Sequence, residues 1–288
     1  MSQTINTNLV SLNAQRNLSS SQSSLATSMQ RLSSGLRVNS AKDDAAGLAI
    51  AERMNAQVRG MNVAARNAND GISLAQVAEG ALSKIGDSLQ RMRELAVQAR
   101  NASNSQSDKD SLDKEFGELA KEIQRVIGGT TFNGKHVIGS DADTLTFQIG
   151  ANTSSDDTIE IATANMSTAT EIIAVTFDPA NPSVRAVIDS TSDTTTLKAV
   201  IDNIDSALNL VNDTRATYGA TQSRFDAIIS NLQVSAENQT AARSRIMDAD
   251  FAAETAALSR AQILQQAGNA MVAQANQLPQ QVLKLLGG

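Results

Sequence analysis

The chain has 288 residues, a formal net charge of -6 and 41% hydrophobic residues, but only 2% aromatic residues and no cysteine. The absence of cysteine excludes a disulfide framework, a thiolate zinc site and a cysteine nucleophile. Large rings usually supply much of a globular core, and here Ala, Leu, Ile and Val replace them, which favours coiled coils and helical bundles.

The start of the chain lacks the apolar run that a signal peptide or a membrane span requires. Residues 1–30 are rich in Ser, Asn, Gln and Thr. We therefore expect no membrane insertion, and export would need a route without such a signal. Basic residues do not cluster beside aromatic ones, so we also expect no binding to nucleic acid.

The first helix is predicted over residues 5–38. Apolar residues recur there at steps of three and four, which places them on one face of a helix. They are Ile5, Leu9, Leu12, Leu25, Met29, Leu32 and Leu36. Few other apolar residues occur in this stretch, so the pattern indicates a narrow seam and not a broad core face.

Two further helices follow. A long apolar stripe predicts a helix over residues 44–100, and the polar residues 100–107 then predict a turn. The third helix is expected to end at Gly128 and Gly129, since glycine is common where helices stop.

The periodicity changes after residue 130. Asn133 and Gly134 predict a tight turn, and alternation around Phe147 and Ile159 predicts strands. We expect a small β-rich excursion with β-hairpins over about residues 130–176. Its Ser/Thr-rich part, residues 153–196, suits O-linked sugars and solvated loops equally well.

The chain then returns to helix. A long helix is predicted from residue 196, although Arg215 and Gln222 stand where its stripe should be apolar. Pro279 should kink or end the last helix. The seam of that helix is predicted to consist of Ala257, Ala261, Leu264, Gly268, Met271, Ala275, Leu278, Val282 and Leu285.

This order of elements predicts a mainly α fold: a long antiparallel coiled-coil or helical-bundle rod, formed by the N- and C-terminal halves, with a small β-rich excursion in the middle. So narrow a terminal seam gives a marginal helix pair, because most helical stability comes from packing the apolar face. Identical neighbours would complete it, and a head-to-tail contact that does not close into a ring gives a filament.

Both ends of the chain resemble the terminal regions of bacterial flagellins. The N-terminal matches are INTN at residues 5–8, SLNAQ at 11–15 and LSSGLRVNSAKDDAAGLAI at 32–50. The C-terminal matches are RIMDADFAAET at residues 245–255, ILQQAG at 263–268 and ANQLPQ at 275–280. The resemblance covers about residues 1–150 and 195–288.

The resemblance implies a subunit that polymerises into the helical flagellar filament for swimming motility. Residues 1–42 and 247–288 would form the inner tube of the filament. Residues 43–176 and 190–246 would form a rod-like outer core. Residues 177–189 would be a short loop in place of the family's variable outer domains.

Partners and location follow from the same resemblance. It implies self-association into an open helical homopolymer and export through the flagellar type III apparatus with a C-terminal chaperone. The filament cap and the hook–filament junction proteins are the other expected partners. The chain would act outside the cell, as part of the bacterial flagellum.

The stretch LQRMRELAVQ at residues 89–98 resembles the segment of flagellins that a host Toll-like receptor binds. Arg91, Leu95 and Glu115 occupy the matching positions. The alternative is that Leu89 and Ala96 belong to the bundle seam and that the charged residues form a solvated face. Under that alternative the segment serves contacts between subunits.

Enzymatic chemistry has little support in the sequence. His136 is the single histidine, so it lacks a second imidazole for a metal site, and Asp43 with Asp44 suits helix capping better than acid–base catalysis. We expect no catalytic, cofactor-binding or metal-binding residues. The rival interpretations are a hook–filament junction protein of the same superfamily and a non-filament coiled-coil adaptor, which would form a discrete oligomer.

Overall fold

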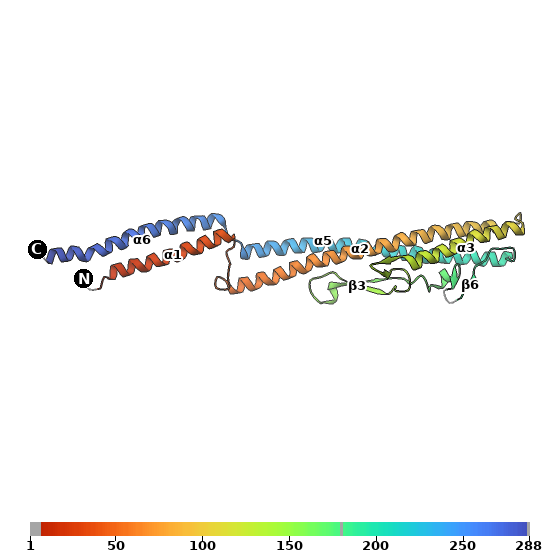
Figure 1. The fold of residues 1–288 in the computed structure, drawn as a ribbon, viewed down its shortest axis with the longest axis horizontal. Helices are drawn as coiled ribbons and strands as arrows, with labels where there is room; N and C mark the ends of the chain where they lie inside the picture. The colour runs from red at the N-terminus through yellow and green to blue at the C-terminus, as the bar shows by residue number, and fades with distance from the viewer. Residues whose placement is uncertain (1–6, 179–180, 287–288) are drawn as a thin grey trace. The chain divides into compact units, whose positions relative to one another are not determined.

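The computed structural model describes residues 7–178 and 181–286. The chain divides into two compact units. We call residues 1–56 with 237–288 the terminal unit, and residues 57–236 the central unit. Their main elements are long helices, as Figure 1 shows, with short strands confined to the middle of the sequence, so the predicted mainly α fold is confirmed.

The helices follow the order expected from the sequence. Their bounds are α1 Leu9–Ser34, α2 Ala45–Ala99, α3 Gln106–Gly129, the short α4 Thr170–Ile173, α5 Thr194–Met247 and α6 Phe251–Leu286. The start of α3 is well defined, because Ser105 and Asp108 form a reciprocal capping box. The sequence predicts helix ends at residues 100 and 129, and α2 and α3 end within one residue of these positions.

In the terminal unit, α1 and α6 pack against each other in antiparallel directions. The first helix ends at Gly35, which adopts φ 71° and donates its N–H to the Arg31 carbonyl over 2.9 Å. Glycine tolerates this left-handed conformation, which most residues avoid. Beyond it, Leu36 forms an antiparallel β-bridge with Asp248. The connector that follows α1 therefore pairs with the connector that precedes α6.

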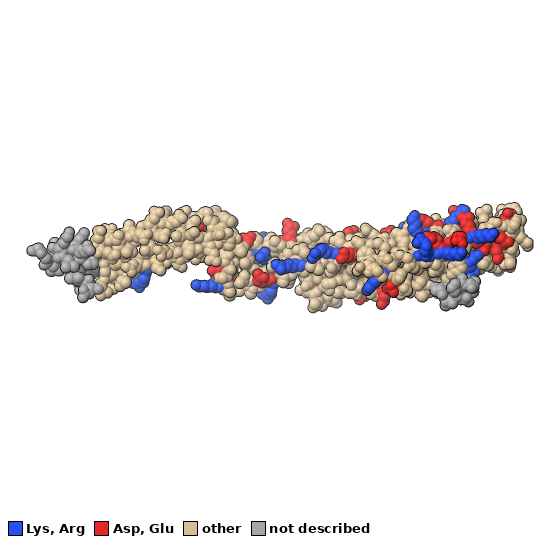
Figure 2. Space-filling model, viewed as in Figure 1, with Lys and Arg blue, Asp and Glu red and all other residues tan. Residues whose placement is uncertain are grey.

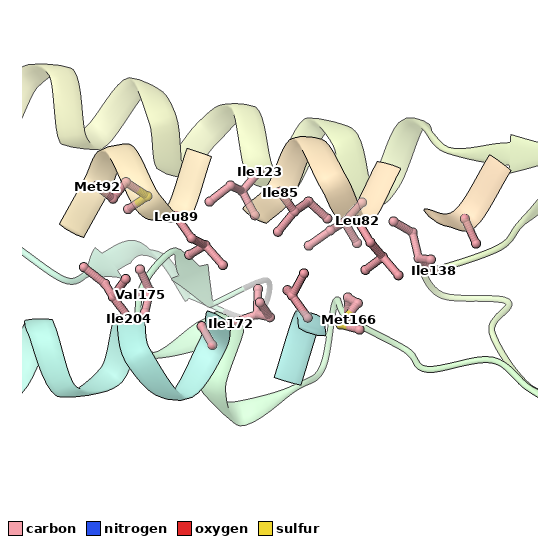
Figure 3. Packing of buried hydrophobic residues seen from close by; sticks show 14 of the residues in the cluster. Leu82, Ile85, Leu89, Met92, Ile123, Ile138, Met166, Ile172, Val175 and Ile204 are labelled. Atoms are coloured by element: carbon pink, nitrogen blue, oxygen red, sulfur yellow. The ribbon is translucent and has the colours of Figure 1, made fainter. Parts of the chain in front are cut away.

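The central unit holds the main apolar core. Residues of α2, α3 and α5 meet there with residues of the β-rich excursion, and Figure 3 shows several of them converging. Leu82 and Leu89 of α2 are fully buried, as are Ile123 of α3 and Ile204 of α5. The excursion contributes Ile172, so it closes one side of the helical core.

The excursion consists of antiparallel two-stranded sheets. β1 (Thr131–Phe132) pairs with β2 (Lys135–His136), and β3 (Thr144–Gln148) pairs with β4 (Thr158–Ala162). The last pair joins β5 (Phe177–Asp178) to β6 (Asn181–Arg185). The predicted turn at Asn133 and Gly134 is confirmed, since both residues have positive φ, at 50° and 80°.

Two close contacts hold the excursion on the helices. A Cβ placed on Gly60 of α2 would lie 2.7 Å from the Cβ of Ala151, so glycine is required for this approach. Near the other end of the excursion, the carboxylate of Asp113 on α3 pairs with the Arg185 guanidinium and accepts the Ile188 N–H over 3.0 Å.

Three details differ from the sequence predictions. The first helix stops at Ser34 and not at residue 38, because Gly35 turns the backbone. Residues 177–189, expected as a loop, include β5 and β6. The last helix is assigned without interruption through Pro279 to Leu286, so the proline does not end it.

Candidate assembly surface

The terminal helix pair is joined by leucines that alternate with small and polar side chains. The less exposed residues of α1 recur at alternating steps of three and four, as a helix–helix seam requires. They are Ser11, Ala14, Leu18, Ser21, Leu25, Ser28 and Leu32. The corresponding residues of α6 are Glu254, Leu258, Ala261, Gln265, Gly268, Val272 and Ala275.

Specific contacts set the alignment of the two helices. Ser11 is 5% exposed and donates its hydroxyl to Asn276 Oδ1 over 2.7 Å. Near the other end, Arg31 Nη1 lies 3.8 Å from Glu254 Oε2. Between them, a Cβ added to Gly268 would lie 3.1 Å from Leu18 Cδ1, so the small residue allows close packing.

Eight other large apolar side chains of the same helices lie outside this seam and are exposed. They are between 48% and 68% exposed: Leu9, Val10, Leu12, Met29, Phe251, Ile263, Leu264 and Met271. A groove of about 310 Å³ lies along the junction of the two helices, and Val10, Leu264 and Met271 line it together with seam residues such as Leu18 and Gly268. A soluble monomer seldom leaves so many large apolar groups in water, so the surface is suited to binding another chain.

Charged side chains are sparse on the same pair. Figure 2 shows its visible face as almost uncharged, while in the central unit charged residues gather around α3. Contact with a neighbour would therefore bury few ions, and the cost of desolvating charge would be small.

The structure divides the predicted seam residues into three groups. Leu9, Leu12, Met29, Leu264 and Met271 are exposed. Partly buried residues are Leu25, Leu32 and Leu36. Ile5 and the side chains of Leu278, Val282 and Leu285 lie outside the described residues.

Sequence reasoning placed Ala261, Gly268 and Ala275 of α6 in the seam, and the structure finds all three at less exposed positions. It missed the serines of α1 that share the seam. Ser28, for example, is 6% exposed although it is polar. The three–four spacing of this seam was present in the sequence, but a search for apolar residues passes over its serines. The serines and glycine bury little apolar area, so the pair alone gains little from the hydrophobic effect.

Residues 89–98, which resemble a receptor-binding segment, include both exposed and buried side chains. Arg91 Nε donates to Glu115 Oε1 over 2.8 Å, and Arg91 Nη1 to Glu94 Oε2 over 2.9 Å. These bonds, the Glu115 bond first, raise the pKa of Arg91. Leu95, in contrast, is 1% exposed and packs in the core. A partner that meets the folded surface would reach Arg91 and Glu115 but not the Leu95 side chain.

Asp43 and Asp44 serve the backbone at the start of α2. Asp44 Oδ1 accepts the Gly47 N–H over 2.8 Å, which caps the helix. Asp43 accepts N–H bonds from Asn39 and Ser40, and these bonds, with the Ser40 hydroxyl, lower the pKa of Asp43. The predicted capping role is confirmed for Asp44.

The described residues include no group of three or more His, Asp or Glu side chains placed to hold a metal ion. None of the helices in this part of the chain is both long enough and apolar enough to cross a membrane.

Comparison with known proteins identifies the family. Residues 5–142 match the model of the bacterial flagellin N-terminal helical region, and residues 201–286 match that of the C-terminal helical region. The chain belongs to the bacterial flagellin family. It is a subunit of the flagellar filament, and the hook–filament junction alternative is not favoured.

Full-length relatives agree with this assignment. The flagellin of Halalkalibacterium halodurans is 44% identical over 98% of this chain and 99% of its own. Flagellins of Xenorhabdus nematophila and Bacillus subtilis are 45% and 41% identical, over 99% and 98% of this chain and 100% and 99% of their own. A crystal structure of Bacillus cereus flagellin has a TM-score of 0.47 at 30% identity, covering 58% of this chain and 88% of that one.

Proposed function

We propose that the chain polymerises through the outward apolar face of its terminal helices, with residues 1–42 and 247–288 forming the inner tube of the filament. Residues 43–176 and 190–246 form the outer core, and residues 177–189 stand where other members carry variable domains. Leu9, Leu12, Met29, Leu264 and Met271 provide that face. Leu25, Leu32 and Leu36 support it from within the helix pair, and Ile5, Leu278, Val282 and Leu285 are proposed to extend the assembly contact.

The observation that carries this proposal is the division of side chains in the helix pair. Serines, alanines and a glycine take many of the positions that face the chain's own partner helix, while Leu264 and Met271 remain 50% and 57% exposed. Complete burial of such a side chain gives roughly 1.5–3 kcal/mol, so covering the exposed half gives roughly 1 kcal/mol per residue. Eight residues of the pair are exposed in this way, so contact with neighbouring chains has a substantial apolar area to bury.

An open polymer is consistent with this surface. The exposed residues lie on both α1 and α6, so both helices can contribute to contacts with neighbours. A repeated contact of this kind, without ring closure, extends into a helical filament.

The remaining partners rest on the resemblance of the two ends to the family. We propose export through the flagellar type III apparatus with a chaperone on the C-terminal segment, followed by addition beneath the filament cap. The filament then continues from the hook–filament junction proteins and lies outside the cell. As a member of a structural family, the chain is proposed to have no catalytic role.

A second proposal concerns host recognition. Arg91 and Glu115 form an exposed ion pair on neighbouring helices, with side chains 49% and 47% exposed. We propose that this pair is the part of the segment that a Toll-like receptor meets. Substitution of Arg91 by Ala should reduce receptor binding by the free chain while leaving filament formation intact. Unchanged receptor binding would overturn this proposal.

Assembly is tested by electron microscopy and sedimentation of the depolymerised chain after addition of short filament seeds. Leu264→Ser with Met271→Ser removes two outward residues, and the loss of roughly 2 kcal/mol should raise the critical concentration at least about tenfold. Val63→Ser with Val77→Ser is the matched control, since both valines are exposed on α2 at 44% and 38%.

A chain lacking residues 257–288 provides the second control and should form no filaments. Filaments from the Leu264/Met271 variant at the wild-type critical concentration would refute the role of the outward face. Filaments from the truncated chain would refute assembly through the terminal helices altogether.

A further inference from the structure

Two polar residues of α5 share one carboxylate of α2 within the central unit. Gln222 Nε2 donates to Glu79 Oε2 over 3.1 Å, and Arg215 Nη2 lies 4.0 Å from Glu79 Oε1. Arg215 and Gln222 are seven residues apart on α5, and the Glu79 carboxylate of α2 contacts both side chains. We call these three residues the Glu79 cluster.

Polar atoms in the cluster and in the neighbouring Tyr218 are poorly satisfied. Tyr218 lies between Arg215 and Gln222 in sequence and is 1% exposed. Among the described residues its hydroxyl has no hydrogen-bond partner, and neither does the buried Arg215 Nε. A buried polar atom without a partner destabilises the fold. The side chains of the Arg215–Glu79 ion pair are about 40% exposed, so the pair contributes little to the free energy of folding. Stability alone is a poor explanation for these residues.

The apolar packing around the cluster repeats every seven residues on both helices. On α2 the fully buried series is Ala68, Ala75, Leu82, Leu89 and Ala96, and on α5 it is Ile204, Val211, Tyr218 and Phe225. A slip of α5 along α2 by seven residues, about 10.5 Å, would again place apolar residues against apolar residues. The apolar seam by itself therefore distinguishes poorly between neighbouring alignments.

The polar residues do distinguish between them. In one slipped alignment Glu79 would keep Gln222 but lose Arg215, which would then face Arg93, another cation. In the opposite slip Glu79 would keep Arg215 and face Leu208, and the Gln222 amide would move beside Ile72. Each slip thus breaks one contact to the carboxylate and leaves a polar group against an unsuitable neighbour.

We propose that the Glu79 cluster fixes the alignment of α2 with α5. A single buried polar residue can select register in a coiled coil at a cost in stability. In this chain, one carboxylate flanked by partners at both ends of a heptad excludes slips in either direction. The alignment matters for a helical polymer because every subunit must present the same surfaces. This role concerns the central unit and does not depend on which residues the terminal helices use for assembly.

Cysteine crosslinking reports the alignment directly, because the chain has no native cysteine. Arg93 and Asp205 face each other, with Nε and Oδ1 separated by 2.6 Å. Arg93→Cys combined with Asp205→Cys therefore reports the native alignment to a short bismaleimide. Lys198 and Asn212 lie seven residues before and after Asp205, so Arg93→Cys combined with Lys198→Cys or with Asn212→Cys reports one slipped alignment each. A short linker joins these pairs only after a slip and therefore distinguishes slipped from native alignments.

The test variant replaces all three residues of the Glu79 cluster with leucine in the full-length chain. We expect the ratio of slipped to native crosslinked product to rise roughly fivefold or more over the background carrying the native cluster. A leucine variant that retains helical circular dichroism and crosslinks only through the native pair would overturn the proposal. If this variant does not fold, Glu79→Leu alone gives the same readout with a smaller rise expected, and no rise would again overturn it.

Two further variants separate alignment from general loss of polarity. Lys84→Leu, Thr217→Leu and Arg224→Leu together introduce the same number of leucines at exposed positions of the same helices, and should leave the ratio unchanged. Exchanging the charges, with Glu79→Arg and Arg215→Glu, should restore native-only crosslinking because Gln222 can donate or accept. A rise with the exposed leucines, or slipped product from the exchanged pair, would overturn the assignment.

Discussion

Tyr218 should make the stability of the central unit depend on pH between about 10 and 12. The ring is 1% exposed, and its hydroxyl has no partner among the described residues. Burial disfavours the phenolate and raises the pKa of Tyr218 from 10.0 to about 12. The unfolded chain therefore loses the proton first, and stability that is fully present below pH 10 is lost as the pH rises to 12.

The size of the effect follows from the difference between the two pKa values. About two pKa units, at about 1.36 kcal/mol each, amount to roughly 2.7 kcal/mol of unfolding free energy. Such a loss is a large part of the stability of an ordinary domain. We therefore expect the helical signal to be lost at lower urea concentration at about pH 12 than at about pH 9.

The assay is unusually clean because Tyr218 is the only tyrosine and the chain has no tryptophan. Phenolate absorbance then reports this one side chain, and circular dichroism at matched pH reports the helices. Tyr218→Phe is the control: it keeps the ring, removes the ionising group and should lack the tyrosine-dependent part of the alkaline loss. At about pH 7 it should be neutral or slightly stabilising, because the removed hydroxyl was unpaired. Phenolate formation near pH 10 while the helices remain intact would refute the reasoning.

Two further substitutions test packing and ion pairing in urea unfolding at neutral pH. Gly71→Ala places a Cβ 2.7 Å from Phe225 Cζ and should cost about 1–2 kcal/mol, whereas Gly80→Ala, with nothing within 4 Å, should gain up to about 1 kcal/mol; equal effects would contradict the close contact. Asp113→Ala should cost about 2–4 kcal/mol, since it leaves the mostly buried Arg185 guanidinium without its partner; a cost below about 1 kcal/mol would show that water replaces the carboxylate.

Much of the secondary structure was readable from the sequence because the local signals agree. The stripe of α2 continues for many turns, so both its existence and its ends were predicted closely. The alternation around Phe147 and the turn at Asn133 and Gly134 correctly indicated β3 and the β1–β2 hairpin. The early end of α1 depended on the left-handed conformation of Gly35, which a repeating pattern does not reveal.

The candidate site was only half readable from the sequence. The positions of Leu9 and Leu264 on a narrow apolar stripe were visible, and they indicate that some helix face needs covering. They do not indicate which chain covers it. The structure shows these side chains exposed and buries Ser11 and Ser28 of α1 instead. That choice depends on how closely two backbones approach, which is a property of the packed pair.

The sequence by itself determined the family, the order of helices and the presence of a β-rich excursion, because periodicity and terminal motifs are local properties of the chain. Only the tertiary structure decided which face of each helix is covered within the chain. It also brought Glu79 between Arg215 and Gln222, residues far from it in sequence. The physical reason is that a heptad pattern repeats. It fixes the helix face that is buried but allows several alignments of one helix along another, whereas a specific set of polar contacts forms in only one of them.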